Sequence, residues 1–79
     1  MDISKIINLV NMYDLDVIRW NEGYITINGQ KQPCYAVIVG LIDEQTKKAI
    51  ERRKMIIKVG DVHYRHAPEI KYNVVYIKY

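Results

Sequence analysis

The stretch CYAVIVGLID, Cys34 to Asp43, is the part of this sequence that says most about its fold. Residues 34–42 are apolar on what would be both faces of a strand. Such a run is typical of a strand covered on both sides, or covered on one side and pressed against a partner on the other. Asp43 is a favoured helix N-cap residue, and the residues that follow it, EQTKKAIERRK (44–54), are expected to be helical. The centre of the core is therefore predicted at residues 34–42, with a helix directly after it.

The residues before this stretch predict a helix and two further strands. Five apolar side chains share one face at helical spacing, namely Ile3, Ile6, Ile7, Val10 and Tyr13. Asp2 can cap the start of this helix. Residues 15–20 and 24–28 are rich in β-branched and aromatic residues, and the Asn-Glu-Gly sequence at 21–23 suits a hairpin turn between them. Asn28-Gly29 is the strongest hairpin signal, and Pro33, which has no N–H, predicts an edge-like start for the next strand.

The residues after the second helix predict two or three more strands. Residues 55–59 leave the helical pattern, Gly60-Asp61 can turn the chain, Ala67-Pro68 breaks it again, and residues 71–79 alternate weakly. The order predicts a single compact α+β domain over residues 1–79. It would contain an N-terminal helix, a three-stranded antiparallel meander, a second helix and two or three further strands.

Size and composition narrow the class of protein. The chain has 79 residues, of which 49% are hydrophobic and 27% are charged, and this is the composition of a folded domain with one core. So small a core leaves homo-oligomerisation open, most simply through the Tyr-rich C-terminal strand if that strand is an edge. Cys34 is the one cysteine, so no disulfide can form within the chain, and its apolar neighbours predict a buried thiol.

No stretch approaches the length of a membrane span, and the N-terminal residues lack the basic start of a secretory signal. We therefore expect a cytoplasmic protein without a membrane partner, acting in its own cell or in the cytoplasm of a host. Small cytoplasmic domains without catalytic motifs are frequent among accessory proteins of viruses and mobile elements.

Charge is concentrated in one segment. Residues 43–58 hold six basic and three acidic side chains, and this difference equals the whole net charge of +3. The acids come first and the bases last, which is the order that the helix dipole favours, so a solvated helix face explains the pattern. The alternative is an anion-binding surface. Its residues would be Lys47, Lys48, Arg52, Arg53 and Lys54.

The predicted order of helix, three strands and helix over residues 3–54 has the pair Lys47-Lys48, followed by Ala49, early in its last helix. This arrangement is similar to a double-stranded RNA-binding domain. The resemblance implies that Lys47 and Lys48 contact phosphates across the major groove, while the first helix and the first hairpin touch the minor groove.

The C-terminal tyrosines could form a second nucleic-acid surface. Single-strand binders combine aromatic stacking with cations, and this segment contains Tyr72, Tyr76 and Tyr79 together with Lys71 and Lys78. Half-buried sheet tyrosines with solvated hydroxyl groups are the alternative interpretation.

The histidines do not predict a catalytic or metal centre. On a strand His63 and His66 would point to opposite faces, and no Cys/His cluster accompanies them. We expect no metal and no cofactor. The enzymatic alternative is a small nuclease-like site with His63 or His66 as the general base.

The function that these patterns favour is protein binding. We expect a small non-enzymatic inhibitor or regulatory accessory module, with its tyrosines and arginines as anchors. Trp20 is expected in the core, with an exposed anchor as the alternative. Nucleic-acid binding through the basic second helix is the alternative function.

Overall fold

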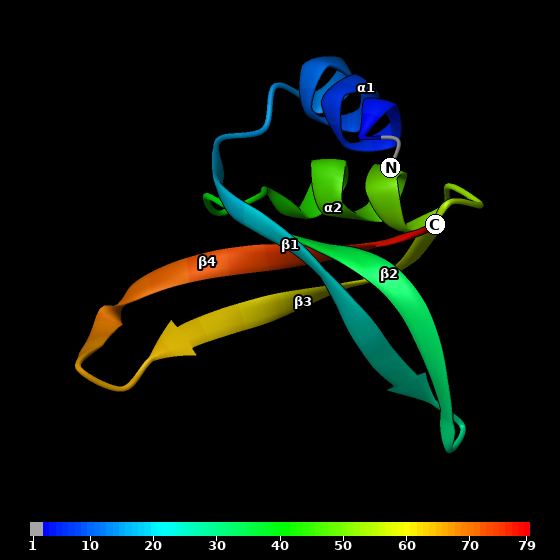
Figure 1. The fold of residues 1–79 in the computed structure, drawn as a ribbon. Coiled ribbons are helices and arrows are strands. Elements are labelled where there is room, and N and C mark those ends of the chain that lie inside the picture. Colours follow the sequence, from blue (N-terminus) through cyan, green and yellow to red (C-terminus); the bar gives the residue numbers. More distant parts are fainter. Residues whose placement is uncertain (1–2) are drawn as a thin grey trace.

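The computed structural model describes residues 3–79, so the predicted cap Asp2 lies outside the described part of the chain. The elements are α1 (Ser4–Tyr13), β1 (Val17–Ile27), β2 (Gln30–Val39), α2 (Glu44–Glu51), β3 (Ile56–Tyr64) and β4 (Ala67–Lys78). The strands form one antiparallel sheet in the order β1-β2-β4-β3. Both helices lie on the same side of it (Figure 1). The α+β prediction is confirmed, with two strands after the second helix.

The predicted three-stranded meander is instead a two-stranded hairpin. Residues 21–23 do not turn, because they continue the ladder between β1 and β2, with Glu22 opposite Tyr35 and Gly23 opposite Cys34. A long partner strand thus keeps a turn-like sequence extended. The double-stranded RNA-binding order of helix, three strands and helix is consequently absent from residues 3–79, where two strands separate the helices.

The turn between β1 and β2 follows the prediction. Asn28 and Gly29 have φ values of 51° and 81°, the two positive values that a tight type I′ hairpin requires. Pro33 also lies where expected, because β2 pairs with β4 only from Cys34 onwards and has one neighbour at Gln30–Pro33. The missing N–H of Pro33 therefore interrupts no central ladder.

The second hairpin differs from the sequence prediction. Gly60 and Asp61 lie within β3, opposite Val74 and Asn73, and the chain turns later, between the paired residues Tyr64 and Ala67. The resulting β4 lies between β2 and β3. Because β4 has a neighbour on each side over Asn73–Ile77, the C-terminal end of the chain does not provide the free edge on which the predicted self-association depended.

The buried face of α1 is shifted from the predicted one. Ile6 and Leu9 are buried and Val10 and Tyr13 pack against the core, whereas Ile7 is 48% exposed. Ile3, also assigned to the buried face, is exposed as well. The spacing i, i+3, i+4, i+7 holds, but it begins at residue 6 instead of residue 3.

The core lies between the sheet and the helices. Val37 and Val39 of β2 and Val75 and Ile77 of β4 are at most 1% exposed, and they cluster with Ile50 of α2. This confirms that the core centres on the segment 34–42.

Cys34 is buried, as predicted, but it does not belong to the core cluster. Successive strand residues point to opposite faces, so the thiol lies on the face opposite to Tyr35. Burial raises the pKa of Cys34 above its ordinary value, which disfavours a reactive thiolate.

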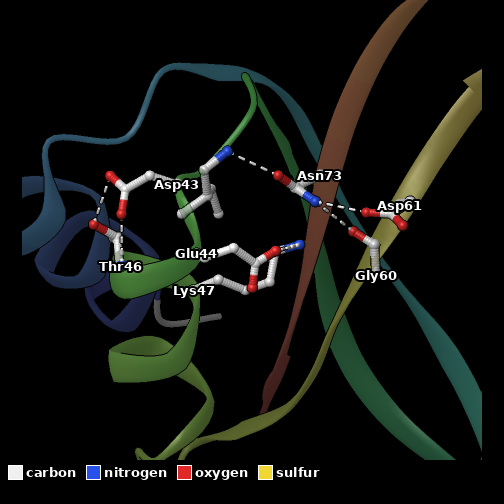
Figure 2. A network of polar contacts seen from close by, with 8 residues as sticks. Asp43, Glu44, Thr46, Lys47, Gly60, Asp61 and Asn73 are labelled. Atoms are coloured by element: carbon white, nitrogen blue, oxygen red, sulfur yellow. Dashed lines mark hydrogen bonds and ion pairs between the residues drawn. The ribbon is translucent and has the colours of Figure 1, made fainter.

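A buried amide ties the start of α2 to the sheet (Figure 2). Asn73 is 1% exposed, and its Oδ1 accepts a 2.8 Å hydrogen bond from the backbone amide of Ile42. Its Nδ2 donates to the Gly60 carbonyl at 3.1 Å and to Oδ1 of Asp61 at 2.9 Å. One side chain thereby joins β4, β3 and the segment leading into α2.

Helix α2 begins at the predicted cap but ends early. The carboxylate of Asp43 accepts hydrogen bonds from the amide and the hydroxyl of Thr46 at 2.8 and 3.0 Å. The helix ends at Glu51, because the amide of Arg53 bonds back to Ile50 in a tighter turn and Ile56 enters the core as part of β3. Residues 52–54, predicted to be helical, therefore lie in the connection.

The cap predicts a pH effect on stability. The hydrogen bonds from Thr46 hold the pKa of Asp43 below the ordinary value of an aspartate side chain. The stabilising charge is therefore fully present above the pKa of the unfolded carboxyl group and is lost as the pH falls through the lower folded pKa. We expect Asp43→Asn, which keeps a cap without a charge, to unfold at a slightly lower temperature than the wild type at about pH 7 and at the same temperature at about pH 2. A difference in melting temperature that does not change with pH would contradict this.

Candidate functional site

The basic segment does not form one solvent-facing patch. Lys47 and Arg53 are half-buried. Nζ of Lys47 lies 3.5 Å from the Glu44 carboxylate, and Nη1 of Arg53 donates to Sδ of Met12 in α1 at 3.2 Å. These two cations are therefore turned toward partners within the chain.

The other three cations of the segment are exposed, but they share their surface with acids. Lys48, Arg52 and Lys54 face solvent. Helix positions three or four residues apart are neighbours, so Lys48 lies beside Glu44 and Glu51. Both carboxylates are exposed too. The mixed charge weakens the case for α2 as a phosphate-binding helix.

Two tyrosines of the predicted stacking platform, Tyr72 and Tyr76, lie on the face of the sheet opposite to the helices. Tyr72 lies opposite Val62 and Tyr76 opposite Ala36, on the face that the helices leave uncovered. Both are half-buried. Lys71, predicted to accompany them, points to the helix side, because it is adjacent to Tyr72 in the strand.

Among the described residues, His63 and His66 are not part of a metal site. His63 lies in β3 opposite Lys71, and His66 lies in the β3–β4 turn. Within residues 3–79 there is no group of three His, Cys, Asp or Glu side chains placed to hold a metal ion. No helix in the same residues has the length and hydropathy to cross a membrane.

A cleft of about 320 Å³ lies between the α1–β1 connection and the start of α2. Its lining includes Asp14, Asp16 and Asp43, with Leu41, which is 67% exposed, among the apolar residues. The carboxylate of Asp43 already accepts the capping hydrogen bond from the Thr46 amide. The three carboxylates make this cleft unsuited to an anionic ligand.

Aromatic side chains gather on the helix side of edge strand β1. Trp20 and Tyr24 share a face of β1, and Tyr35 of β2 and Tyr79 beyond β4 lie next to them. The rings of Trp20 and Tyr35 meet edge to face at 5.9 Å, and those of Tyr35 and Tyr79 lie 4.8 Å apart. We call Trp20, Tyr24, Tyr35 and Tyr79 the aromatic cluster.

The aromatic cluster is well exposed for its size. Tyr35 is the buried member of the cluster, whereas Trp20, Tyr24 and Tyr79 are 38, 72 and 53% exposed. Large aromatic side chains that remain exposed on a small protein suggest an interaction site. The placement of Trp20 in the core is therefore wrong.

A carboxylate lies within the aromatic cluster. Glu22 sits between Trp20 and Tyr24 on the same face of β1, opposite Tyr35. Desolvation of the Tyr79 hydroxyl, followed by the negative charge of Glu22, raises the pKa of Tyr79. No ion pair among residues 3–79 involves Glu22. The surface therefore combines apolar rings with an unpaired negative charge.

The sequence pattern missed this grouping for a clear reason. Trp20 and Tyr24 lie on either side of Asn21–Gly23, which was expected to turn, and a turn would have separated their faces. The alternation of Trp20, Glu22 and Tyr24 was the available signal.

Comparison of the chain with protein-family models, with curated proteins and with solved structures finds no match.

Proposed function

We propose that this chain is a small non-enzymatic binding protein, an inhibitor or accessory module, that binds another protein through the aromatic cluster. The observation that carries the proposal is the exposure of Trp20, Tyr24 and Tyr79 around the buried ring of Tyr35. Trp and Tyr are the residue types most often found as binding hot spots, because they bury a large area with few rotatable bonds. The cytoplasm, of its own cell or of a host, is the compartment we propose.

The chemistry of the surface indicates what kind of protein it accepts. Glu22 has no cationic partner within residues 3–79, and burying it against a purely apolar surface would leave its charge uncompensated. The partner should therefore present a lysine or arginine that meets Glu22, surrounded by apolar side chains that pack on the rings. A guanidinium could also stack on an aromatic ring.

Capture experiments with matched variants test this proposal. Tagged wild-type protein is isolated from its native cells with nuclease present, and the captured protein is identified by mass spectrometry. Tyr24→Ala and Trp20→Ala should each weaken its binding by about thirtyfold, the effect of losing a hot-spot residue. Calorimetry with the purified partner gives this ratio.

The control removes an equally exposed apolar side chain elsewhere. Leu41 is 67% exposed and lies at the acidic cleft, so Leu41→Ala should bind as the wild type does. Glu22→Lys should abolish binding by opposing the partner's cation. A captured protein that binds Tyr24→Ala and Leu41→Ala equally well would contradict the proposal, as would a partner that is captured only when nuclease is left out.

A further inference from the structure

Neither helix lies on the face of the sheet opposite to α1 and α2, and we call it the open face (Figure 1), although Cys34 and Val74 on it are buried. Residues directly opposite each other in neighbouring strands point to the same face. The core residues Val37 and Val75 face the helices. Their strand neighbours Ile38 and Val74, which are paired with each other, therefore belong to the open face.

The pairing of the strands leaves carboxylates on one face only, although cations lie on both. Arg19 lies opposite Ile38, Lys78 opposite Cys34, and Lys58 opposite Tyr76, so these three cations are on the open face. The carboxylate residues that pair with a residue of a neighbouring strand are on the helix side of the sheet.

Glu22 lies opposite Tyr35, and Asp61 lies opposite Asn73. Tyr35 belongs to the core cluster and Asn73 bonds to the segment before α2, which places both acids on the helix side. Among the paired positions, the open face therefore carries cations and no carboxylate.

Aromatic rings lie among these cations. Nζ of Lys58 is 5.8 Å from the ring centre of Tyr76, and the rings of Tyr64 and Tyr72 meet edge to face at 5.6 Å. A methyl group built on Gly60 would lie 3.9 Å from Cε2 of Tyr76. The Tyr76 ring therefore extends across the sheet toward β3 and does not project away from it.

We propose that the open face binds single-stranded nucleic acid, with Arg19, Lys58 and Lys78 at phosphates and Tyr76 as a stacking platform for a base. The cations favour an anionic occupant, and the half-buried ring offers a surface on which any base can stack. A second copy of the chain packed face to face would instead bring like charges together. This inference uses a different face from the aromatic cluster and does not rest on the proposed function.

Fluorescence anisotropy with labelled single strands of roughly ten nucleotides, oligo-dT and oligo-U, measures the binding. Contacts with three phosphates predict that the affinity falls about twentyfold between 50 and 200 mM salt. The triple variant Arg19→Gln/Lys58→Gln/Lys78→Gln should weaken binding at least about tenfold and flatten the salt dependence. Absence of binding by the wild type at about 50 mM salt would overturn the proposal.

A matched variant separates this surface from net charge. Lys48→Gln/Arg52→Gln/Lys54→Gln also removes three positive charges, but from exposed positions in and after α2. It should bind the single strands as the wild type does. Equal losses in the two triple variants would show that binding follows overall charge or uses α2, and would overturn the assignment to the open face.

The stacking role of Tyr76 has its own test. Tyr76→Leu should lose about tenfold in affinity, because a base stacks on a ring and not on an aliphatic side chain, whereas Tyr76→Phe should bind as the wild type does. Thermal unfolding of each variant verifies that it is folded. If Phe and Leu are equivalent in folded proteins, Tyr76 is not a platform.

Two competitors identify the occupant. An unlabelled duplex of the same length should compete poorly, because its bases are not available to the ring, and polyglutamate should compete poorly because it lacks bases. Polyglutamate as effective as the single strand would make the occupant an acidic protein segment and overturn the proposal. A duplex as effective as the single strand would overturn the single-strand specificity.

Discussion

Replacing Ile50 by alanine is expected to lower the free energy of unfolding by about 3 kcal/mol. Ile50 is fully buried, the one buried residue of α2, and it joins that helix to the core cluster. Its removal loses apolar burial and leaves a cavity that the sheet, held by its backbone ladders, cannot close. For a domain of this size the melting temperature should fall by about 12–24 °C, which circular dichroism measures.

The matched control makes the same chemical change on the exposed side of the other helix. Ile7 is 48% exposed, so Ile7→Ala should cost less than about 1 kcal/mol. Similar losses at the two positions would show that α2 is not anchored through Ile50 and that burial is not the cause of the effect.

Replacing Asn73 by leucine, a residue of similar size, is expected to cost about 2–3 kcal/mol, since the buried amide of Ile42 would lose its acceptor. The Gly60 carbonyl would lose a donor as well. The start of α2 would no longer be tied to β4. Chemical denaturation gives the change in stability, and hydrogen exchange of the Ile42 amide reports the lost bond directly.

A second variant separates the buried contacts of Asn73 from its outer one. Asp61 is exposed and accepts one hydrogen bond from Asn73. Asp61→Ala should therefore cost less than about 1 kcal/mol and leave the Ile42 amide protected. An Asn73→Leu variant as stable as the wild type would contradict the network as a source of stability.

Local patterns predicted the features that depend on residues close together in the chain. Asp43 caps α2 because Thr46, three residues later, brings its amide within reach. Asn28-Gly29 turns because these two residues tolerate positive φ. The run from Cys34 to Val39 lies in an interior strand because its apolar side chains leave little to expose.

Strand lengths and neighbours were decided by pairing between distant residues. Asn21–Gly23 has the composition of a turn, yet it stays extended because β2 provides partners along that whole segment. Gly60-Asp61 stays extended for the same reason, with Val74 and Asn73 opposite it. Loss of these ladders would leave backbone groups unpaired, a cost that outweighs a local turn preference.

The α+β class, the cap of α2, the first hairpin turn and the types of residue available for binding follow from local patterns along the chain. Which of those residues meet depends on how the strands pair and the helices pack. Strand register sets the face of every side chain, so it placed Trp20 and Tyr24 together on one side and Lys58 with Tyr76 on the other. Packing of α1 beside the segment after α2 turned Arg53 toward Met12. Strand register and helix packing depend on contacts between segments far apart in the chain, which no local pattern contains.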